Sequence, residues 1–560
     1  MKHLPRNVAR AWRRLPMVIG LAVLAVLAGT IPAVAATGSA AAGSAAATAK
    51  PVASPASSAS RCDATYLRSA LHLAGVTVDS ASLNATGSFT SPGQPAITGL
   101  PTFCDVALTQ TDSAGNPIHT YVWLPDTWNG SFQGVGGAVF ECGPVFTETA
   151  TAIQGGYASA TTDCGVNPAD LLTGSWALNP DGTANTSLID DFSYAGIHDM
   201  TVAGKAVTQA YYPSQLRYSY FNGCSTGGRE GLMEAQRYPA DYNGIVSGSP
   251  AINWTKFIPS ELWPELVMLQ ANDFLPACKE TAFTNAVTAA CADGSGVIEN
   301  PANCHFNPFK LVGEVTPCGT ITKTDATVME EIWEGPVVDG KHLWYGLEPG
   351  ASVLSLAATT TANGTTSADP FPIPVGWLQY WLTHNPDFDW KTLTYEQFLR
   401  YFDQSVAEFA YPIATDNPNL SAFENDGGKI LIWHGLADQL IFPQGTIQYY
   451  QRVQETLGAQ NTASFARLFI APGAQHCAAA AGPAPANPLQ DVVNWVENGQ
   501  APTTILATGG TDPATNQPTQ RPLCMYPYLS QYVSGNPDSL SSYNCRLLTP
   551  EQQRQLTALN

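Results

Sequence analysis

The feature that most constrains this sequence is the segment at residues 220–229, which reads YFNGCSTGGR and places Ser225 in the pattern Gly-x-Ser-x-Gly. Residues 217–221 ahead of it are aromatic and alternating, which predicts a strand. Residues 226–237 behind it carry apolar positions suited to one face of a helix. A strand, a sharp glycine-flanked turn and a helix together are the context in which this pattern forms a nucleophile elbow.

The same pattern also occurs in ordinary glycine-rich turns, and this chain is rich in Gly, Ser and Ala, so the flanking elements decide the interpretation. Gly223 and Gly227 would let the turn lift the Ser225 hydroxyl clear of the sheet, because a side chain at either position would clash. A helix that begins just after Ser225 aims free backbone N–H groups at a developing oxyanion. The amide of Thr226 is therefore a candidate oxyanion donor.

A second candidate donor loop follows the strand that we expect at residues 132–135. That strand runs into Gly136, Gly137 and Ala138, and a strand that ends in glycines leaves backbone amides uncovered. Esterases of the α/β-hydrolase type take their second oxyanion donor from such a loop. We therefore regard Gly137 and Ala138 as candidate oxyanion residues, with a plain turn as the alternative.

The first 35 residues have the pattern of a secretory signal peptide. An apolar run at residues 17–29 precedes the small-residue cleavage sequence Ala33-Val34-Ala35. The basic residues ahead of the run are Lys2, Arg6, Arg10, Arg13 and Arg14. The pair Arg13-Arg14 hints at twin-arginine export, but the rest of that pattern is poor, so ordinary secretion is favoured. Residues 36–60 are mostly Ala, Ser, Gly, Thr and Pro, which predicts a disordered linker.

Charge and cysteine content narrow the partners and the compartment. Removal of residues 1–35 takes away five basic and no acidic residues, which changes the formal net charge from −20 to −25. This acidic balance argues against nucleic acid or an anionic membrane as a partner. The twelve cysteines suit an oxidising compartment. They are scattered rather than arranged in Cys-x-x-Cys pairs, which argues against a zinc site. Oligomeric state is not indicated by any of these features.

The order of predicted elements divides the rest of the chain into three parts. Residues 61–250 and 426–560 alternate strand-like and helix-like patterns and predict the two parts of a catalytic α/β domain. Residues 251–425 lose this alternation, hold seven of the thirteen tryptophans, and predict an inserted lid domain. Most of these tryptophans are expected in the lid's own core, with one or two facing the catalytic cleft, where they would suit a flat aromatic substrate. The individual strands are expected at residues 102–111, 118–124, 132–135, 157–162, 217–221, 244–249, 428–433 and 465–471, with helices at 194–212, 226–237 and 491–497.

A serine nucleophile needs a base to take its proton and an acid to hold that base in the right tautomer. Asp438 follows the predicted strand at 428–433, and His476 follows the predicted strand at 465–471. Both residues thus lie just past the carboxyl ends of strands, where open α/β sheets place their active sites. The order Ser225, Asp438, His476 is the order of an α/β-hydrolase triad.

Two further residues bear on the triad. His434 is the main competitor as base, but it precedes the acid in the chain and is better explained as a structural residue at a strand end. Cys224 precedes the nucleophile, and Cys477 follows the proposed base. A disulfide between these two cysteines would hold their Cα atoms roughly 4.4 to 6.8 Å apart and would help to keep the Ser225 hydroxyl near the imidazole.

This Cys-Ser, Asp, His-Cys arrangement resembles the tannase and feruloyl esterase family, over nearly all of the chain from Cys62 to Cys545. The most specific stretches are GCSTGGREGLMEAQRYPADYNGIVSGSPA (223–251), KILIWHGLADQLIFP (429–443), HC (476–477) and RPLCMYP (521–527). The resemblance implies an α/β-hydrolase fold with a large inserted lid, a Ser225–His476–Asp438 triad, and no cofactor for catalysis. It also implies an oxyanion hole made by the Thr226 amide and the region of Gly137 or Ala138.

The resemblance further implies a Cys224–Cys477 disulfide beside the active site and, by similarity, the pairs Cys62–Cys104, Cys291–Cys304 and Cys524–Cys545. By elimination, the remaining cysteines would pair as Cys142–Cys164 and Cys278–Cys318. Members of the family bind a structural calcium through a loop rich in carboxylates. The matching stretch here, residues 291–298, is shorter and has the single acid Asp293, which alone cannot supply the many oxygen ligands of calcium.

We therefore expect a secreted serine carboxylesterase that acts on esters of plant aromatic acids. Feruloyl or other hydroxycinnamoyl esters are the first expectation, and gallate esters, the tannase activity, are the alternative. A hypothesis of another class is a non-catalytic secreted binding protein on a hydrolase scaffold. The complete set of Ser225, Asp438 and His476 argues against it, because a binding protein has no reason to keep all three in order.

Overall fold

A mixed nine-stranded sheet forms the centre of the protein, whose computed structural model describes residues 58–71, 73–512 and 517–559. The predicted signal peptide and nearly all of the predicted linker lie outside these residues. In spatial order the strands are β1 (Val76–Asn84), β4 (Phe103–Thr111), β5 (Pro117–Pro125), β7 (Ala158–Thr162), β6 (Ser131–Val135), β8 (Tyr218–Cys224), β9 (Gly244–Gly248), β16 (Lys429–Gly435) and β17 (Ala466–Ala471).

The first three neighbouring pairs, β1 with β4, β4 with β5 and β5 with β7, are antiparallel. All the pairs that follow, from β7 with β6 to β16 with β17, are parallel. The hairpin predicted around residues 112–116 is confirmed, with Val106 of β4 opposite Val122 of β5. Every strand expected from the sequence is present, with ends that differ by three residues or fewer, and strand β1 at the edge of the sheet was not predicted. The α/β-hydrolase fold expected from the sequence is confirmed.

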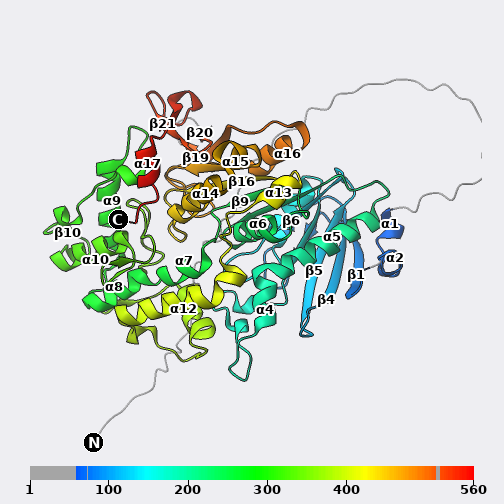
Figure 1. Cartoon of the computed structure of the whole chain (residues 1–560), viewed down its shortest axis with the longest axis horizontal. Coiled ribbons are helices and arrows are strands. Elements are labelled where there is room, and N and C mark those ends of the chain that lie inside the picture. Colours follow the sequence, from blue (N-terminus) through cyan, green and yellow to red (C-terminus); the bar gives the residue numbers. More distant parts are fainter. Residues whose placement is uncertain (1–57, 72, 513–516, 560) are drawn as a thin grey trace, which may run out of the picture. The chain divides into compact units, whose positions relative to one another are not determined.

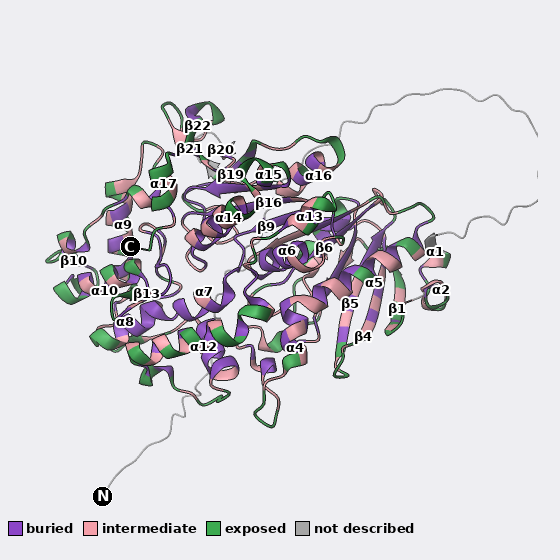
Figure 2. Cartoon of the chain, viewed as in Figure 1, coloured by how far each residue is buried: buried purple, intermediate pink, exposed green. Residues whose placement is uncertain are grey.

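Helices cover both faces of the sheet. Neighbouring residues in a strand point to opposite faces, so each packs against helices on its own side. Phe221 of β8 packs into the large core beneath helix α6 (Thr226–Arg237), where its ring lies against Gly231. Tyr220, the preceding residue, points the other way and packs with Val492 of helix α16 (Pro488–Asn498). In Figure 2 helix α6 is coloured as buried along its length, which agrees with its position between the sheet and the inserted helices.

The helices outside the insertion are α1 (Ser58–Arg61), α2 (Ala64–Ala70), α3 (Phe146–Gln154), α4 (Thr186–Asp190), α5 (Gly196–Tyr211), α6 (Thr226–Arg237), α14 (Pro443–Leu457), α15 (Ala459–Phe465), α16 (Pro488–Asn498) and α17 (Pro550–Gln555). Antiparallel strands outside the central sheet complete this part of the chain: β2 (Ser88–Phe89), β3 (Ile97–Thr98), β18 (Ala484–Pro485), β19 (Thr504–Asp512), β20 (Gln517–Cys524), β21 (Tyr528–Tyr532) and β22 (Tyr543–Leu547).

Residues 249–428 form an insertion, because β9 and β16 are adjacent parallel strands and the chain between them adds no strand to the sheet. Its helices are α7 (Trp254–Ser260), α8 (Trp263–Ala271), α9 (Ala277–Cys291), α10 (Lys323–Glu334), α11 (Pro372–Gly376), α12 (Tyr395–Ile413) and α13 (Ser421–Asn425). Its hairpins are β10 (Val315–Thr316) with β11 (Gly319–Thr320), β12 (Val337–Val338) with β13 (Lys341–His342), and β14 (Thr359–Ala362) with β15 (Thr365–Ala368). Figure 1 shows α7, α8 and α12 together on one side of the sheet. The described chain packs as one compact unit, so the exact lid boundaries stay predictions.

Six disulfides join all twelve cysteines, and every pairing expected from the sequence is present. Four of them, Cys62–Cys104, Cys142–Cys164, Cys224–Cys477 and Cys524–Cys545, lie outside the insertion, and the other two lie within it.

None of the helices in the described part of the chain has both the length and the apolar character needed to cross a bilayer.

Candidate active site

Ser225 lies at the turn between strand β8 and helix α6, and its backbone is strained. Its φ of 62° and ψ of −124° belong to a region that residues with a side chain rarely adopt. The turn is held by two backbone hydrogen bonds, from the Ser225 amide to the Gly248 carbonyl and from the Ala251 amide to the Ser225 carbonyl, each 3.0 Å long. Strain of this kind persists only where the surroundings over-determine it, as they do at a nucleophile elbow.

The flanking glycines allow two segments of backbone to approach closely. A Cβ atom on Gly223 would lie 2.4 Å from the carbonyl carbon of Gly227. A Cβ atom on Gly136, in the loop after β6, would lie 2.5 Å from the Cα of Gly227. No side chain fits at these separations, so the glycines of both motifs are required by the packing of the elbow against the neighbouring loop.

Asp438 and His476 meet at the carboxyl ends of β16 and β17. The Nδ1 atom of His476 lies 2.8 Å from Oδ2 of Asp438. The other carboxylate oxygen, Oδ1, accepts the backbone amides of Leu440 and Ile441, both at 2.9 Å. Burial alone would raise the pKa of Asp438, but His476 and His434 outweigh it and hold that pKa below its usual range. The carboxylate is therefore charged and fixed in place.

His434 also reaches the Asp438 carboxylate. Its Nε2 lies 3.0 Å from Oδ2 of Asp438 and 3.2 Å from the carbonyl oxygen of Ile441, and its Nδ1 lies 2.9 Å from the Thr446 hydroxyl. Both atoms near Nε2 are acceptors, so this nitrogen carries a proton. The side chain of His434 is fully buried, whereas that of His476 is 13% exposed.

The Cys224–Cys477 disulfide places its two Cα atoms 6.0 Å apart and joins the chain immediately before Ser225 to the chain immediately after His476. Ser225 and His476 both line one small cavity. No hydrogen bond joins the two side chains in the described structure, and such contacts commonly tighten only when substrate binds.

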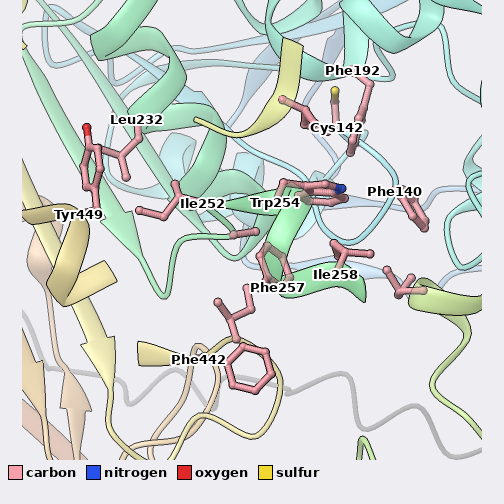
Figure 3. Close-up of a cluster of buried hydrophobic side chains, with 14 of the residues drawn as sticks. Phe140, Cys142, Phe192, Leu232, Ile252, Trp254, Phe257, Ile258, Phe442 and Tyr449 are labelled. Carbon is pink, nitrogen blue, oxygen red and sulfur yellow. The ribbon is translucent and has the colours of Figure 1, made fainter. Parts of the chain in front are cut away.

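The cavity has a volume of about 30 Å³. Such a volume holds a water molecule, so the ring of an aromatic acid enters only when side chains of the wall move. The loop that carries Ser225 and the loop that carries His476 are called the two catalytic loops below. Apart from the residues of these loops, the wall of the cavity is largely apolar and includes Trp254, Phe257, Ile258, Leu440 and Ile441. Figure 3 shows Trp254, Phe257 and Ile258 projecting from helix α7 of the insertion. Trp254 is thus one of the inserted tryptophans that face the cleft.

The structure differs from the sequence prediction at the second oxyanion donor. The Gly137 amide donates to Oε2 of Glu230 at 3.0 Å, and the Ala138 amide donates to the Glu141 carbonyl at 3.1 Å. Both amides are therefore already engaged inside the protein. The next amide along the chain, that of Val139, has no hydrogen-bond partner among the described residues, and Val139 lines the cavity.

Val139 and Thr226 are linked directly. The Thr226 hydroxyl donates to the Val139 carbonyl at 2.8 Å, and the Thr226 amide, like that of Val139, has no partner among the described residues. Val139 has a φ of 47°, which is strained for a β-branched residue. Two free amides beside Ser225, one on a strained residue, are the features of an oxyanion hole.

Glu230 is a residue of the site that the sequence reasoning missed. It lies on helix α6, five positions after Ser225, and is completely enclosed. Burial raises the pKa of Glu230 to about 8. The positive charge of Arg229 and the hydrogen bond from the Gly137 amide lower this pKa, but the effect of burial is larger. The glutamate of the sequence GREGL is the signal that could have revealed it, since a carboxyl group on the buried face of a helix needs a partner.

The donors around Asp293 do not fit the calcium site of the family. Oδ1 of Asp293 already accepts the amide and the hydroxyl of Ser295. The buried guanidinium of Arg521 donates to the same Ser295 hydroxyl at 2.9 Å, and it also acts on the neighbouring Glu299. The two carboxylates of Asp293 and Glu299, with a guanidinium in contact with the loop, make a poor calcium site, since calcium takes six to eight oxygen ligands.

Three other ligand-type residues, His198, Glu234 and Asp241, have donor atoms within 4.8 Å of one another. The Asp241 carboxylate already has two partners, His198 Nδ1 at 2.6 Å and the ammonium of Lys205 at 3.8 Å. The lysine supplies the positive charge that a metal would bring, so this cluster is explained as an ion-pair network.

The fold and the site define an ester hydrolase of the α/β-hydrolase class. A sequence profile described as "Tannase and feruloyl esterase" matches residues 104–546. The chain belongs to the tannase and feruloyl esterase family.

Individual relatives agree with this assignment. The chain is 42% identical over 470 residues to a "Probable feruloyl esterase" of Arthroderma benhamiae, covering 81% of this chain and 87% of that protein. It is 29% identical to "Feruloyl esterase C" of Talaromyces stipitatus, covering 87% and 95% of the two chains. Among solved structures, feruloyl esterase B from Aspergillus oryzae superimposes with a TM-score of 0.76 at 26% identity, covering 88% of this chain and all of that one. Tannin acyl hydrolase from Aspergillus niger gives a TM-score of 0.79 at 23% identity, covering 90% and 98%, and so shows the shared fold.

Proposed function

We propose that this protein is a secreted serine esterase that hydrolyses esters of plant aromatic acids, with feruloyl and other hydroxycinnamoyl esters as its preferred substrates. The observation that carries the proposal is the small cavity that joins Ser225 and His476 and is walled by Trp254, Phe257 and Ile258. Such a wall suits a flat aromatic acyl group, and the two polar residues lie where its carbonyl would react.

In the first half-reaction the Ser225 Oγ attacks the ester carbonyl carbon while His476 Nε2 takes the hydroxyl proton. The His476 Nδ1–H donates to Asp438, which fixes the tautomer and stabilises the imidazolium that forms. The carbonyl oxygen becomes negatively charged and is held by the free amides of Thr226 and Val139. Collapse of this intermediate breaks the bond to the alcohol, which leaves with the proton from His476.

In the second half-reaction His476 takes a proton from water, and the resulting hydroxide attacks the acyl carbon. The same two amides hold the second oxyanion. Its collapse returns the proton to Ser225 Oγ and releases the free aromatic acid. These steps use the side chains and backbone of the chain alone, and we propose that no cofactor takes part.

The gallate esters of the tannase activity are the second candidate substrate. The apolar wall of the cavity favours a hydroxycinnamoyl ring, which carries fewer hydroxyl groups to desolvate than a galloyl ring does. The name of the Arthroderma benhamiae relative points the same way. The six disulfides support export to an oxidising compartment, where such substrates are found.

The test is release of free acid from methyl ferulate and from methyl gallate by the purified protein and by Ser225→Ala. We expect faster hydrolysis of methyl ferulate and a loss of at least about 1,000-fold in kcat with Ser225→Ala. Equal rates in the two proteins would exclude Ser225 as the nucleophile. Absence of hydrolysis of these and other aryl esters by a correctly folded protein would instead support a non-catalytic binding protein.

A further inference from the structure

Glu261 lies directly after helix α7 and contributes to the wall of the active-site cavity, yet the mechanism above does not use it. Only 3% of the Glu261 surface is exposed to solvent. Helix α7 also carries Trp254, Phe257 and Ile258, so the carboxyl group belongs to the same surface that faces the acyl group of the substrate.

The Glu261 carboxyl group has no hydrogen-bond partner among the described residues, and its Oε2 is completely shielded from solvent. A buried polar group without a partner lowers the stability of the folded protein, because it has lost its hydrogen bonds to water. The other residues of the wall outside the two catalytic loops are apolar, among them Phe371 and Ile373 of the insertion. Two buried polar groups of this wall thus lack a partner, the Glu261 carboxyl group and the indole N–H of Trp254. Of the two, only the carboxyl group can both donate and accept, and a ligand that bonds to it would recover the cost.

The charge state of Glu261 decides what it can bind. Burial raises the pKa of Glu261 well above its usual value, and the nearby negative charge of Asp438 raises it further. The group is therefore a neutral carboxylic acid, which can donate one hydrogen bond and accept others. A neutral acid suits a hydroxyl group, which also donates and accepts, and it leaves the Asp438 charge undisturbed.

We propose that Glu261 is the specificity residue of the acyl cavity and that it recognises a phenolic hydroxyl on the ring of the substrate acid. This inference rests on the proposed function, since it assigns the ring of the acyl group to the cavity. The preferred substrates are esters of hydroxylated aromatic acids. An analogue without the hydroxyl leaves Glu261 unpaired, and a methylated hydroxyl can only accept, so the carbonyl oxygen of Glu261 loses its donor. A site with an unpaired buried group discriminates strongly against such analogues.

The experiment compares kcat/KM for three methyl esters: ferulate, its 4-O-methyl ether 3,4-dimethoxycinnamate, and unsubstituted cinnamate. Wild-type protein is compared with Glu261→Gln, which keeps a donor and an acceptor, and with Glu261→Met, which removes both. Glu265→Gln is the matched control, because Glu265 is equally buried on the next helix but does not line the cavity. Methyl gallate serves as a fourth substrate and distinguishes a galloyl hydroxyl from a hydroxycinnamoyl one.

We expect wild-type protein to prefer ferulate over the dimethoxy ester by at least about tenfold, the value of one good hydrogen bond. Glu261→Met should lose this preference, because its kcat/KM should fall much further for ferulate than for cinnamate, and Glu261→Gln should keep most of the preference. The Glu265→Gln control should match wild type on all substrates. An equal loss on all esters with Glu261→Met, or no preference in wild type, would overturn the proposal.

A second readout separates this inference from the proposed function. Binding of free ferulic acid and free 3,4-dimethoxycinnamic acid to Ser225→Ala can be measured by titration calorimetry. Tighter binding of ferulic acid, abolished by adding Glu261→Met, supports the role of Glu261 even if no cinnamate ester is hydrolysed. Equal affinities for the two acids would overturn it even if the esterase activity is confirmed.

Discussion

The Nε2 atom of His434 lies 3.0 Å from Oδ2 of Asp438 in the fully buried interior below the catalytic residues. Asp438, which we propose as the acid of the triad, therefore accepts hydrogen bonds from two histidines on the same oxygen. One of these histidines faces the cavity and the other does not, so their roles can be separated by mutation.

Replacement of His434 should weaken catalysis through Asp438. His434→Leu removes one of the interactions that hold the pKa of Asp438 below its usual range, so that pKa should rise. We expect a loss of about tenfold in kcat with little change in KM, and an acid limb of the pH–rate profile that moves to higher pH. His434→Gln can still donate to the carboxylate and should restore part of the rate. His119→Leu, at a partly buried His–Asp pair that does not line the cavity, is the control. An unchanged pH profile in His434→Leu would contradict the prediction.

Removal of the Cys224–Cys477 disulfide should lower both activity and stability. The bond closes a loop of 253 residues and ties the two catalytic loops together. We expect the double variant Cys224→Ala/Cys477→Ala to lose about 2 to 5 kcal/mol of unfolding free energy and at least about tenfold in kcat. The control is Cys291→Ala/Cys304→Ala in the insertion, where the sequence separation is 13. That control should unfold more easily but keep its kcat, and similar kcat losses in both variants would argue against a positioning role.

Stability should fall as the pH rises above the mildly acidic range. Burial raises the pKa of Glu265 and of Glu280 to about 8, from an ordinary value of 4.5, and Glu265 raises that of Glu280 further. The folded protein thus holds these protons more tightly than the unfolded chain, so their contribution is full below about pH 4.5 and is lost as the pH rises through 8. We expect Tm to be higher at pH 5 than at pH 8.5 by about 5 °C or more. Glu280→Gln should flatten this slope, and a rising Tm across the same range would contradict the assignment.

A chelator should not destabilise the protein. The guanidinium of Arg521 contacts the loop at Asp293, which the resemblance to the family marked as a possible calcium loop, and we expect EDTA to change Tm by less than about 1 °C. Arg521→Met should lower Tm by several times that amount, because it leaves the carboxyl groups of Asp293 and Glu299 without the neighbouring cation. Arg546→Met, at an exposed arginine, is the control. A clear fall in Tm with EDTA that added calcium reverses would show that the site binds the metal.

Local sequence signals were sufficient to predict much of this protein. The elbow around Ser225, the strands that carry Asp438 and His476, and helix α6 each follow from patterns within about ten residues, because strand and helix periodicities depend on neighbouring side chains. The order of these elements predicted an α/β domain, and the resemblance to a family predicted the α/β-hydrolase fold and four of the disulfides. The pairs Cys142–Cys164 and Cys278–Cys318 followed by elimination. The predicted hairpin of β4 and β5 was likewise a local feature.

Long-range contacts decided the rest. The second free amide is at Val139 rather than at Gly137 or Ala138, because Glu230, almost a hundred residues away in sequence, takes the Gly137 amide. Glu261 reads in the sequence as one acid within an apolar stretch, and only packing of the insertion against the catalytic loops places it in the cavity. The sequence by itself determined which chemistry this chain carries, since the reactive residues lie in local motifs. The tertiary structure alone decided which donors are free and which acid faces the substrate, because hydrogen-bond partners and burial are set by residues distant in the chain.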